Sequence, residues 1–160
     1  LTYKPAVECS AKPFFTGAIY YLSGDKDEGA GHNDSSWDPL WSRWPQFSEL
    51  YAYNTIYGPG YWSNLLYPHV AAGVDIAPGH KVSSSLGPMY AAEEDGLGGG
   101  DGDLRGWLGM LRYDFPLLKD IFGKRGMLYG HVMAEVLDPG DYYTSDQWVY
   151  FLRWQVDAKF

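Results

Sequence analysis

The last thirteen residues of the chain, WVYFLRWQVDAKF (residues 148–160), place an apolar side chain at every second position. The intervening positions from residue 153 onward are polar: Arg153, Gln155, Asp157 and Lys159. Successive side chains of a β-strand point to opposite faces, so the segment is predicted to be a strand with one apolar and one charged face. It is longer than the roughly 9–11 residues that a tilted strand needs to cross a bilayer, which indicates a transmembrane strand.

Six earlier segments are predicted to be strands of the same kind: residues 1–9, 13–22, 65–76, 81–92, 104–115 and 126–137. Turn sequences separate several of them, as in Ala-Pro-Gly-His at 77–80 and Asp-Pro-Gly-Asp at 138–141. Pro88 cannot donate to a ladder, so a bulge is expected there. The chain is therefore predicted to be all-β and antiparallel with seven strands, or eight if Glu49–Tyr57 is a strand and not a short helix or part of a loop.

From residue 65 onward, each predicted strand has one face that is more apolar than the other, and this face is predicted to point outward. Over 104–115 this orientation places Trp107, Leu111 and Phe115 outward and leaves Arg112 and Asp114 inward, where a charge costs less than it does in lipid. The outward residues of the strands predicted over 65–76 and 126–137 are Leu66, Pro68, Val70, Ala72, Val74 and Ile76, and Leu128, Gly130, Val132, Ala134 and Val136.

Connections between the predicted strands alternate in length. Those at 10–12 and 77–80 are short and the one at 116–125 is moderate, whereas 23–63, 93–103 and 138–146 carry loops or a polar turn. Transmembrane barrels have short periplasmic turns and longer external loops. Residues 1–160 are therefore interpreted as one unit, a segment of a bacterial outer-membrane β-barrel. Complete single-chain barrels have even strand numbers, so seven strands predict further strands from upstream sequence or from another chain.

Composition excludes several other classes. With 12 Lys and Arg against 20 Asp and Glu, the net charge is -8, which argues against a nucleic-acid partner. Cys9 is the only cysteine, so neither a disulfide framework nor a cysteine-based metal site is expected. No apolar run reaches the roughly 18 residues of a transmembrane helix.

Four stretches resemble the C-terminal part of the alginate-export family of outer-membrane barrels: AIYYLSGD (18–25), WDPLWSRWP (37–45), SELY (48–51) and LDPGDYY (137–143). The resemblance implies a larger barrel of about 16–18 strands that passes an acidic polysaccharide, or a similar solute, outward by diffusion. Such exporters are expected to have an arginine- and lysine-rich constriction. Here the inward residues also include Asp75, Asp114, Glu135 and Asp157, so the polysaccharide is not carried over directly.

Two groups of residues are candidates for the solute path. Arg112, Arg153, Glu135, His131 and Asp157 fall on predicted inward faces and would line the lumen. The loop 23–63 is rich in aromatics, and its Trp37, Trp41, Arg43 and Trp44 would lie at the barrel mouth. There the loop could form a plug or gate that contacts sugar rings, or it could cap the upper rim.

No residue pattern predicts catalysis. His69 and His131 face inward near carboxylates, but their spacing fits no metal motif, and a polar hydrogen-bond network is the preferred interpretation. The acidic loop 93–103 does not match a calcium loop. We therefore predict a passive channel with no catalytic residue, metal or cofactor, in contact with lipid and lipopolysaccharide. The alternative is a soluble extracellular β-sandwich that binds carbohydrate through exposed aromatics.

Overall fold

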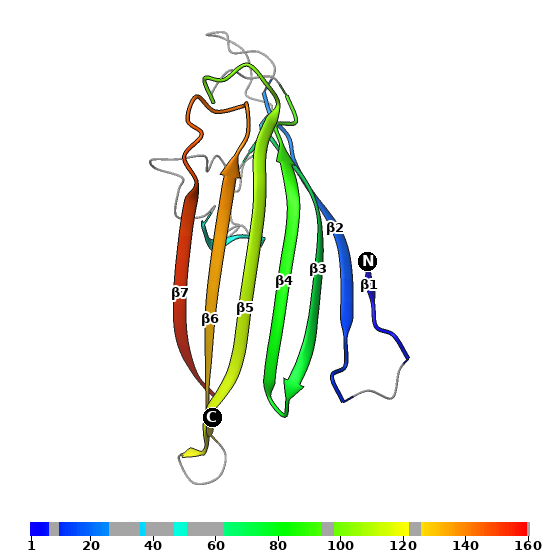
Figure 1. The fold of residues 1–160 in the computed structure, drawn as a ribbon, viewed down its shortest axis with the longest axis vertical. Helices are drawn as coiled ribbons and strands as arrows, with labels where there is room; N and C mark the ends of the chain where they lie inside the picture. Colours follow the sequence, from blue (N-terminus) through cyan, green and yellow to red (C-terminus); the bar gives the residue numbers. More distant parts are fainter. Residues whose placement is uncertain are drawn as a thin grey trace.

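The computed structural model describes residues 1–6, 10–25, 36–37, 47–50, 63–93, 98–121 and 126–159. Within them, seven strands form one sheet in chain order: β1 (Thr2–Tyr3), β2 (Phe14–Leu22), β3 (Leu65–Ala77), β4 (His80–Tyr90), β5 (Leu104–Asp120), β6 (Gly126–Pro139) and β7 (Val149–Lys159). Each strand is antiparallel to its neighbours, and Figure 1 shows them side by side in a single layer. The prediction of an antiparallel all-β chain is confirmed.

Most strand boundaries lie within one or two residues of the prediction. β5 is one of two exceptions, because it continues to Asp120 where a connection from 116 was predicted. Its register with β6 shifts between Pro116 and Leu118, after which Lys119 pairs with Met127. The shift accommodates the proline and lets pairing resume, which shortens the connection to β6.

The first strand also differs from its prediction. Pairing with β2 is confined to Thr2 and Tyr3, where a strand over 1–9 was expected. Residues 7–9 lie outside the described part of the chain, as does Phe160. Beside Pro88, the register between β4 and β5 shifts between Met89 and Tyr90, in keeping with the expected bulge.

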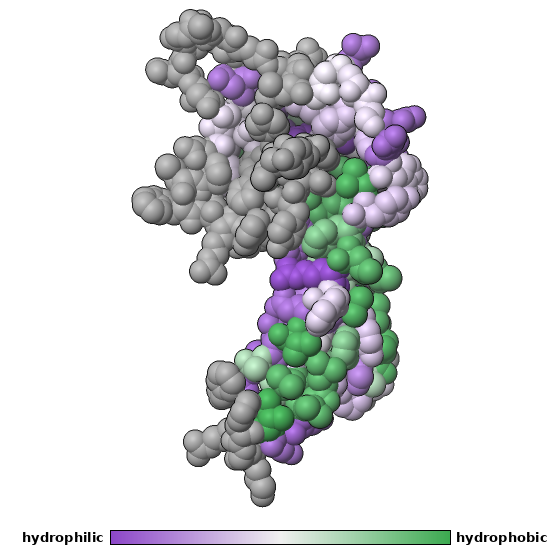
Figure 2. All heavy atoms as spheres, turned by 90° about the vertical axis from the view of Figure 1, so that its left-hand side faces the viewer, coloured by the Kyte–Doolittle hydropathy of each residue, from purple (hydrophilic) through white to green (hydrophobic). Residues whose placement is uncertain are grey.

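The register aligns the predicted outward residues on one face of the sheet, here called the apolar face. One continuous row of paired residues runs from β7 to β2 as Leu152, Ala134, Leu111, Ser84, Ala72 and Phe15. The neighbouring row, on the opposite or polar face, runs as Arg153, Met133, Arg112, Ser83, Gly73 and Phe14. Figure 2 shows the apolar residues gathered on one side of the sheet and hydrophilic residues on the other.

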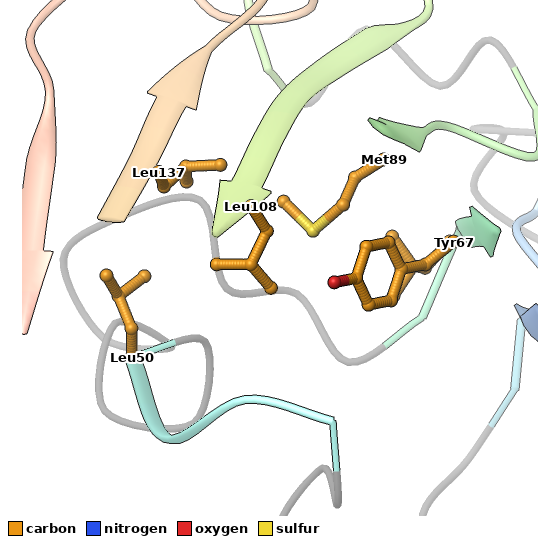
Figure 3. Close-up of a cluster of buried hydrophobic side chains, with 6 residues drawn as sticks. Leu50, Tyr67, Met89, Leu108 and Leu137 are labelled. Atoms are coloured by element: carbon orange, nitrogen blue, oxygen red, sulfur yellow. The ribbon is translucent and has the colours of Figure 1, made fainter. Parts of the chain in front are cut away.

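A small core lies on the polar face toward the end of the sheet that carries the long loops. It contains Leu50, Leu65, Tyr67, Met89, Leu108 and Leu137 (Figure 3). Five of these residues come from strands and Leu50 comes from the predicted loop 23–63. Part of that loop therefore packs against the sheet. Among the described residues, no helix is both long and apolar enough to cross a bilayer.

Candidate functional site

Large hydrophobic side chains on the apolar face are exposed. Leu152 is 74 % exposed, Trp154 77 %, Val70 67 % and Leu111 56 %. The face contains no Asp, Glu, Lys or Arg at the alternate positions 15–21, 66–74, 82–90, 107–115, 128–136 and 150–158. An exposed apolar surface of this extent marks contact with lipid or with another protein.

Aromatic residues lie toward both ends of the apolar face. On β5, Trp107 is near the loop end, and Tyr113 and Phe115 stack on each other with ring centroids 5.1 Å apart near the other end. At about 3.3 Å per residue, the eight steps from Trp107 to Phe115 span roughly 26 Å along the strand. That length is close to the apolar band of about 25 Å found on outer-membrane barrels.

Polar side chains on β5, β6 and β7 form a connected network on the polar face. Arg112 donates to both carboxylate oxygens of Asp114 at 2.6–3.0 Å, and its Nη2 lies 3.4 Å from His131 Nδ1. Gln155 donates to Asp157 at 2.6 Å and accepts from Arg153. Side chains of opposite charge lie beside one another in this network. Their electrostatic fields therefore largely cancel at the polar face.

All five predicted path residues lie on the polar face, but they are not equally accessible. The side chains of Arg112, Arg153 and Asp157 are 38 %, 31 % and 48 % exposed. Glu135 and His131 are buried, at 3 % and 7 %. In this arrangement the first three can touch a solute, whereas the buried pair acts on neighbouring protein groups.

Glu135 is buried because a short stretch of the predicted mouth loop, Phe47–Leu50, covers it. We call this stretch the inward segment. One carboxylate oxygen of Glu135 accepts the Glu49 N–H at 2.9 Å, and the other accepts the Leu50 N–H at 3.2 Å and the Ser48 hydroxyl. These three hydrogen bonds satisfy the buried carboxylate.

Further contacts of three residues hold the inward segment on the sheet. Arg153 Nη1 lies 2.5 Å from the Glu49 carboxylate, and Leu50 is 1 % exposed within the core. The Phe47 ring packs against Tyr20 and Tyr67, with centroid distances of 5.1 and 5.5 Å. No local pattern in the sequence indicates Glu135 as the anchor, because the partner groups are 85–87 residues away along the chain.

Of the four predicted mouth residues, only Trp37 is described; Trp41, Arg43 and Trp44 lie outside the described residues. The Trp37 N–H donates to the Ser23 carbonyl at 3.0 Å, which places it at the base of the loop that follows β2.

Arg105, which the sequence analysis did not single out, joins two connections at the loop end, those before β3 and after β6. It is 1 % exposed and donates to the carbonyls of Ser63 and Asn64 at 3.1 and 2.8 Å and to the Tyr143 hydroxyl at 3.1 Å. Its guanidinium lies 5.1 Å from the centre of the Tyr142 ring. A planar group with five donors suits this role, since it satisfies several groups in fixed directions.

The described residues contain no cluster of three or more His, Cys, Asp or Glu suited to a metal ion. His69 stacks against Tyr67 and Tyr20, with centroids 4.6 and 5.6 Å away, and its buried Nδ1 has no hydrogen-bond partner in the described part of the chain. A single orphan nitrogen in an aromatic stack offers no ligand set.

No protein-family model, curated protein or solved structure matches the chain. The resemblance to alginate-export barrels stays a prediction, and the functional interpretation depends on the geometry described above.

Proposed function

We propose that this sheet is part of an outer-membrane β-barrel whose polar face lines a passive path for solutes. The observation that carries the proposal is the apolar face, which six neighbouring strands build without a charged residue at the alternate positions 15–21, 66–74, 82–90, 107–115, 128–136 and 150–158. Asp138, which pairs with Trp107, lies just beyond these positions at the loop end. Side chains such as Leu152 and Trp154 would be poorly placed in water, whereas lipid solvates them at no cost.

Closure of the barrel is part of the proposal. Among the described residues, β7 pairs only with β6, and β1 covers only two residues of β2. In lipid each unpaired backbone group costs several kcal/mol, so an open edge is not tolerated there. Further strands, from upstream sequence or from another chain, would therefore continue the sheet at both edges.

The side chains of the polar face are compatible with passive passage of polar solutes but do not indicate one particular solute. Arg112 is paired with Asp114 and Arg153 with Glu49, so both arginines are locally neutralised. An acidic polysaccharide, which the resemblance implies, would be drawn by uncompensated cations. Because both arginines are paired, the polar face of the described strands does not separately indicate such a solute. The proposal is therefore a channel for polar solutes in general, and acidic polysaccharide is a candidate solute only through the family resemblance.

The alternative, a soluble carbohydrate-binding sandwich, requires the apolar face to be covered. In a sandwich, a second sheet covers the apolar face of the first about 10 Å away. All seven described strands lie in one sheet, and the apolar side chains of its central strands are exposed. The membrane proposal accounts for that exposure without an additional layer.

Cell fractionation followed by gel mobility tests the proposal. A protein that stays in the outer-membrane fraction, requires detergent, and migrates differently before and after boiling supports a closed barrel. Uptake of sugars by vesicles containing the purified full-length protein then tests passage. A monomer that is soluble in plain buffer would overturn the barrel and leave the sandwich as the better account.

A further inference from the structure

We infer that the inward segment, Phe47–Leu50, is a constriction of the solute path and that Glu135 is the residue that positions it. This inference rests on the proposed channel function. In this inference Glu135 is a positioning residue that does not contact solute.

The contacts show that the segment is attached to the polar face at several points. Three groups from consecutive residues, Ser48, Glu49 and Leu50, converge on the one carboxylate of Glu135. Two of those donors are backbone N–H groups, which no substitution within the segment short of proline removes. Glu135 is therefore the one side chain whose loss frees all three groups at once.

The position of the segment on the sheet makes it a constriction. Glu135 pairs with Met110 on β5 and Phe151 on β7, inside the strands but toward the ends that carry the long loops. The Glu49 carboxylate reaches Arg153 on β7. The segment thus crosses the polar face over β6 and β7, where it occupies space that solutes would otherwise use.

Packing fixes the depth of the segment. Leu50 is inserted among Leu108, Leu137 and other core side chains from four strands (Figure 3). The apolar insertion and the polar anchor act on adjacent residues, so the segment cannot shift outward without breaking both. Without the anchor, two backbone donors are left unmet, and only the apolar contacts and the Arg153–Glu49 ion pair still hold the segment on the sheet.

Two readouts test the inference in full-length protein reconstituted into phospholipid vesicles. The variant Glu135→Ala removes the anchor, and Asp138→Ala, an exposed carboxylate three residues further along β6, is the matched control. Hydrogen–deuterium exchange over 47–50 reports attachment. Vesicle swelling in a neutral trisaccharide, relative to a neutral monosaccharide, reports the width of the path.

Protection of the Glu49 and Leu50 amides is expected to fall by at least about tenfold in Glu135→Ala, since one hydrogen bond to a charged group contributes enough for roughly that factor. The trisaccharide-to-monosaccharide ratio is expected to rise in the same variant and to stay at the wild-type value in Asp138→Ala. If Glu135→Ala does not give the heat-shifted band of a folded barrel, Leu50→Ala takes its place, because Leu50 lies outside the sheet.

The outcomes separate the two proposals. Unchanged amide protection in Glu135→Ala would overturn Glu135 as the anchor. Lost protection with an unchanged sugar ratio would overturn the constriction. A wild-type protein that passes neither sugar would instead overturn the proposed channel, and amide exchange would still decide whether Glu135 holds the segment.

Discussion

A lysine placed on the apolar face should destabilise the protein by an amount that depends on its distance from the ends of the apolar band. Leu111 lies midway along β5 between Trp107 and Phe115, about 13 Å along the strand from each. A lysine near the midplane of an outer-membrane barrel costs about 2–4 kcal/mol, and near the interface about 0–1 kcal/mol. For Leu111→Lys, the ratio of folded to unfolded protein should fall roughly 25- to 700-fold.

Leu118 provides a closely matched control. It lies on the same strand and is 56 % exposed, as Leu111 is, but it follows Phe115 near the opposite end from the long loops. A lysine there can extend its ammonium group to the interface, so Leu118→Lys should cost less than about 1 kcal/mol. In a water-soluble sheet, two equally exposed leucines would respond alike, with small changes for both.

Urea unfolding of the wild-type protein and both variants in phospholipid vesicles measures this difference. The expected result is a large loss of unfolding free energy for Leu111→Lys and a small one for Leu118→Lys. Equal losses in the two variants would refute the assignment of the apolar face to lipid.

Three further predictions concern other parts of the sheet. Arg105→Lys keeps the charge but loses the planar fork, so it should lower stability by about 1–3 kcal/mol in urea unfolding and speed proteolysis of the loop connections. Gly130→Ala places a methyl group 2.7 Å from a phenylalanine ring on the neighbouring strand, whereas the methyl group of Gly17→Ala meets nothing within 4 Å. Gly130→Ala should therefore lower the free energy of unfolding by about 1–3 kcal/mol, and Gly17→Ala should leave it nearly unchanged. Replacing Arg112 and Arg153 together by Glu should lower anion conductance while the heat-shifted band persists, and unchanged ion selectivity would remove both residues from the solute path.

The strands could be predicted from the sequence because an alternating pattern reports directly on the two faces of a strand. The prediction for the apolar face held along β3, β6 and β7, and the register then joined separate stripes into one surface. Local rules were weaker where a proline interrupts pairing. The sequence predicts that the strand ends at Phe115, before Pro116, but the register shift after the proline lets β5 continue to Asp120.

Contacts between distant segments could not be predicted from the sequence. Glu135 was placed on the correct face by its parity alone, yet its burial depends on Phe47–Leu50, which a long connection brings back to the sheet. Arg105 was missed for the same reason, since its partners belong to separate loops. Contacts between distant segments produce no periodic residue pattern, so the sequence does not indicate them.

The central claim, that the apolar face meets lipid, is tested most directly by spin labels placed one at a time along β7, from Tyr150 to Asp157, in protein whose Cys9 is replaced by serine. In bilayers, collision rates with oxygen, which concentrates in lipid, should alternate with a period of two and be highest at Tyr150, Leu152, Trp154 and Val156. Rates that do not alternate, or a water-soluble relaxant that reaches those four sites more readily than their neighbours, would contradict the membrane assignment.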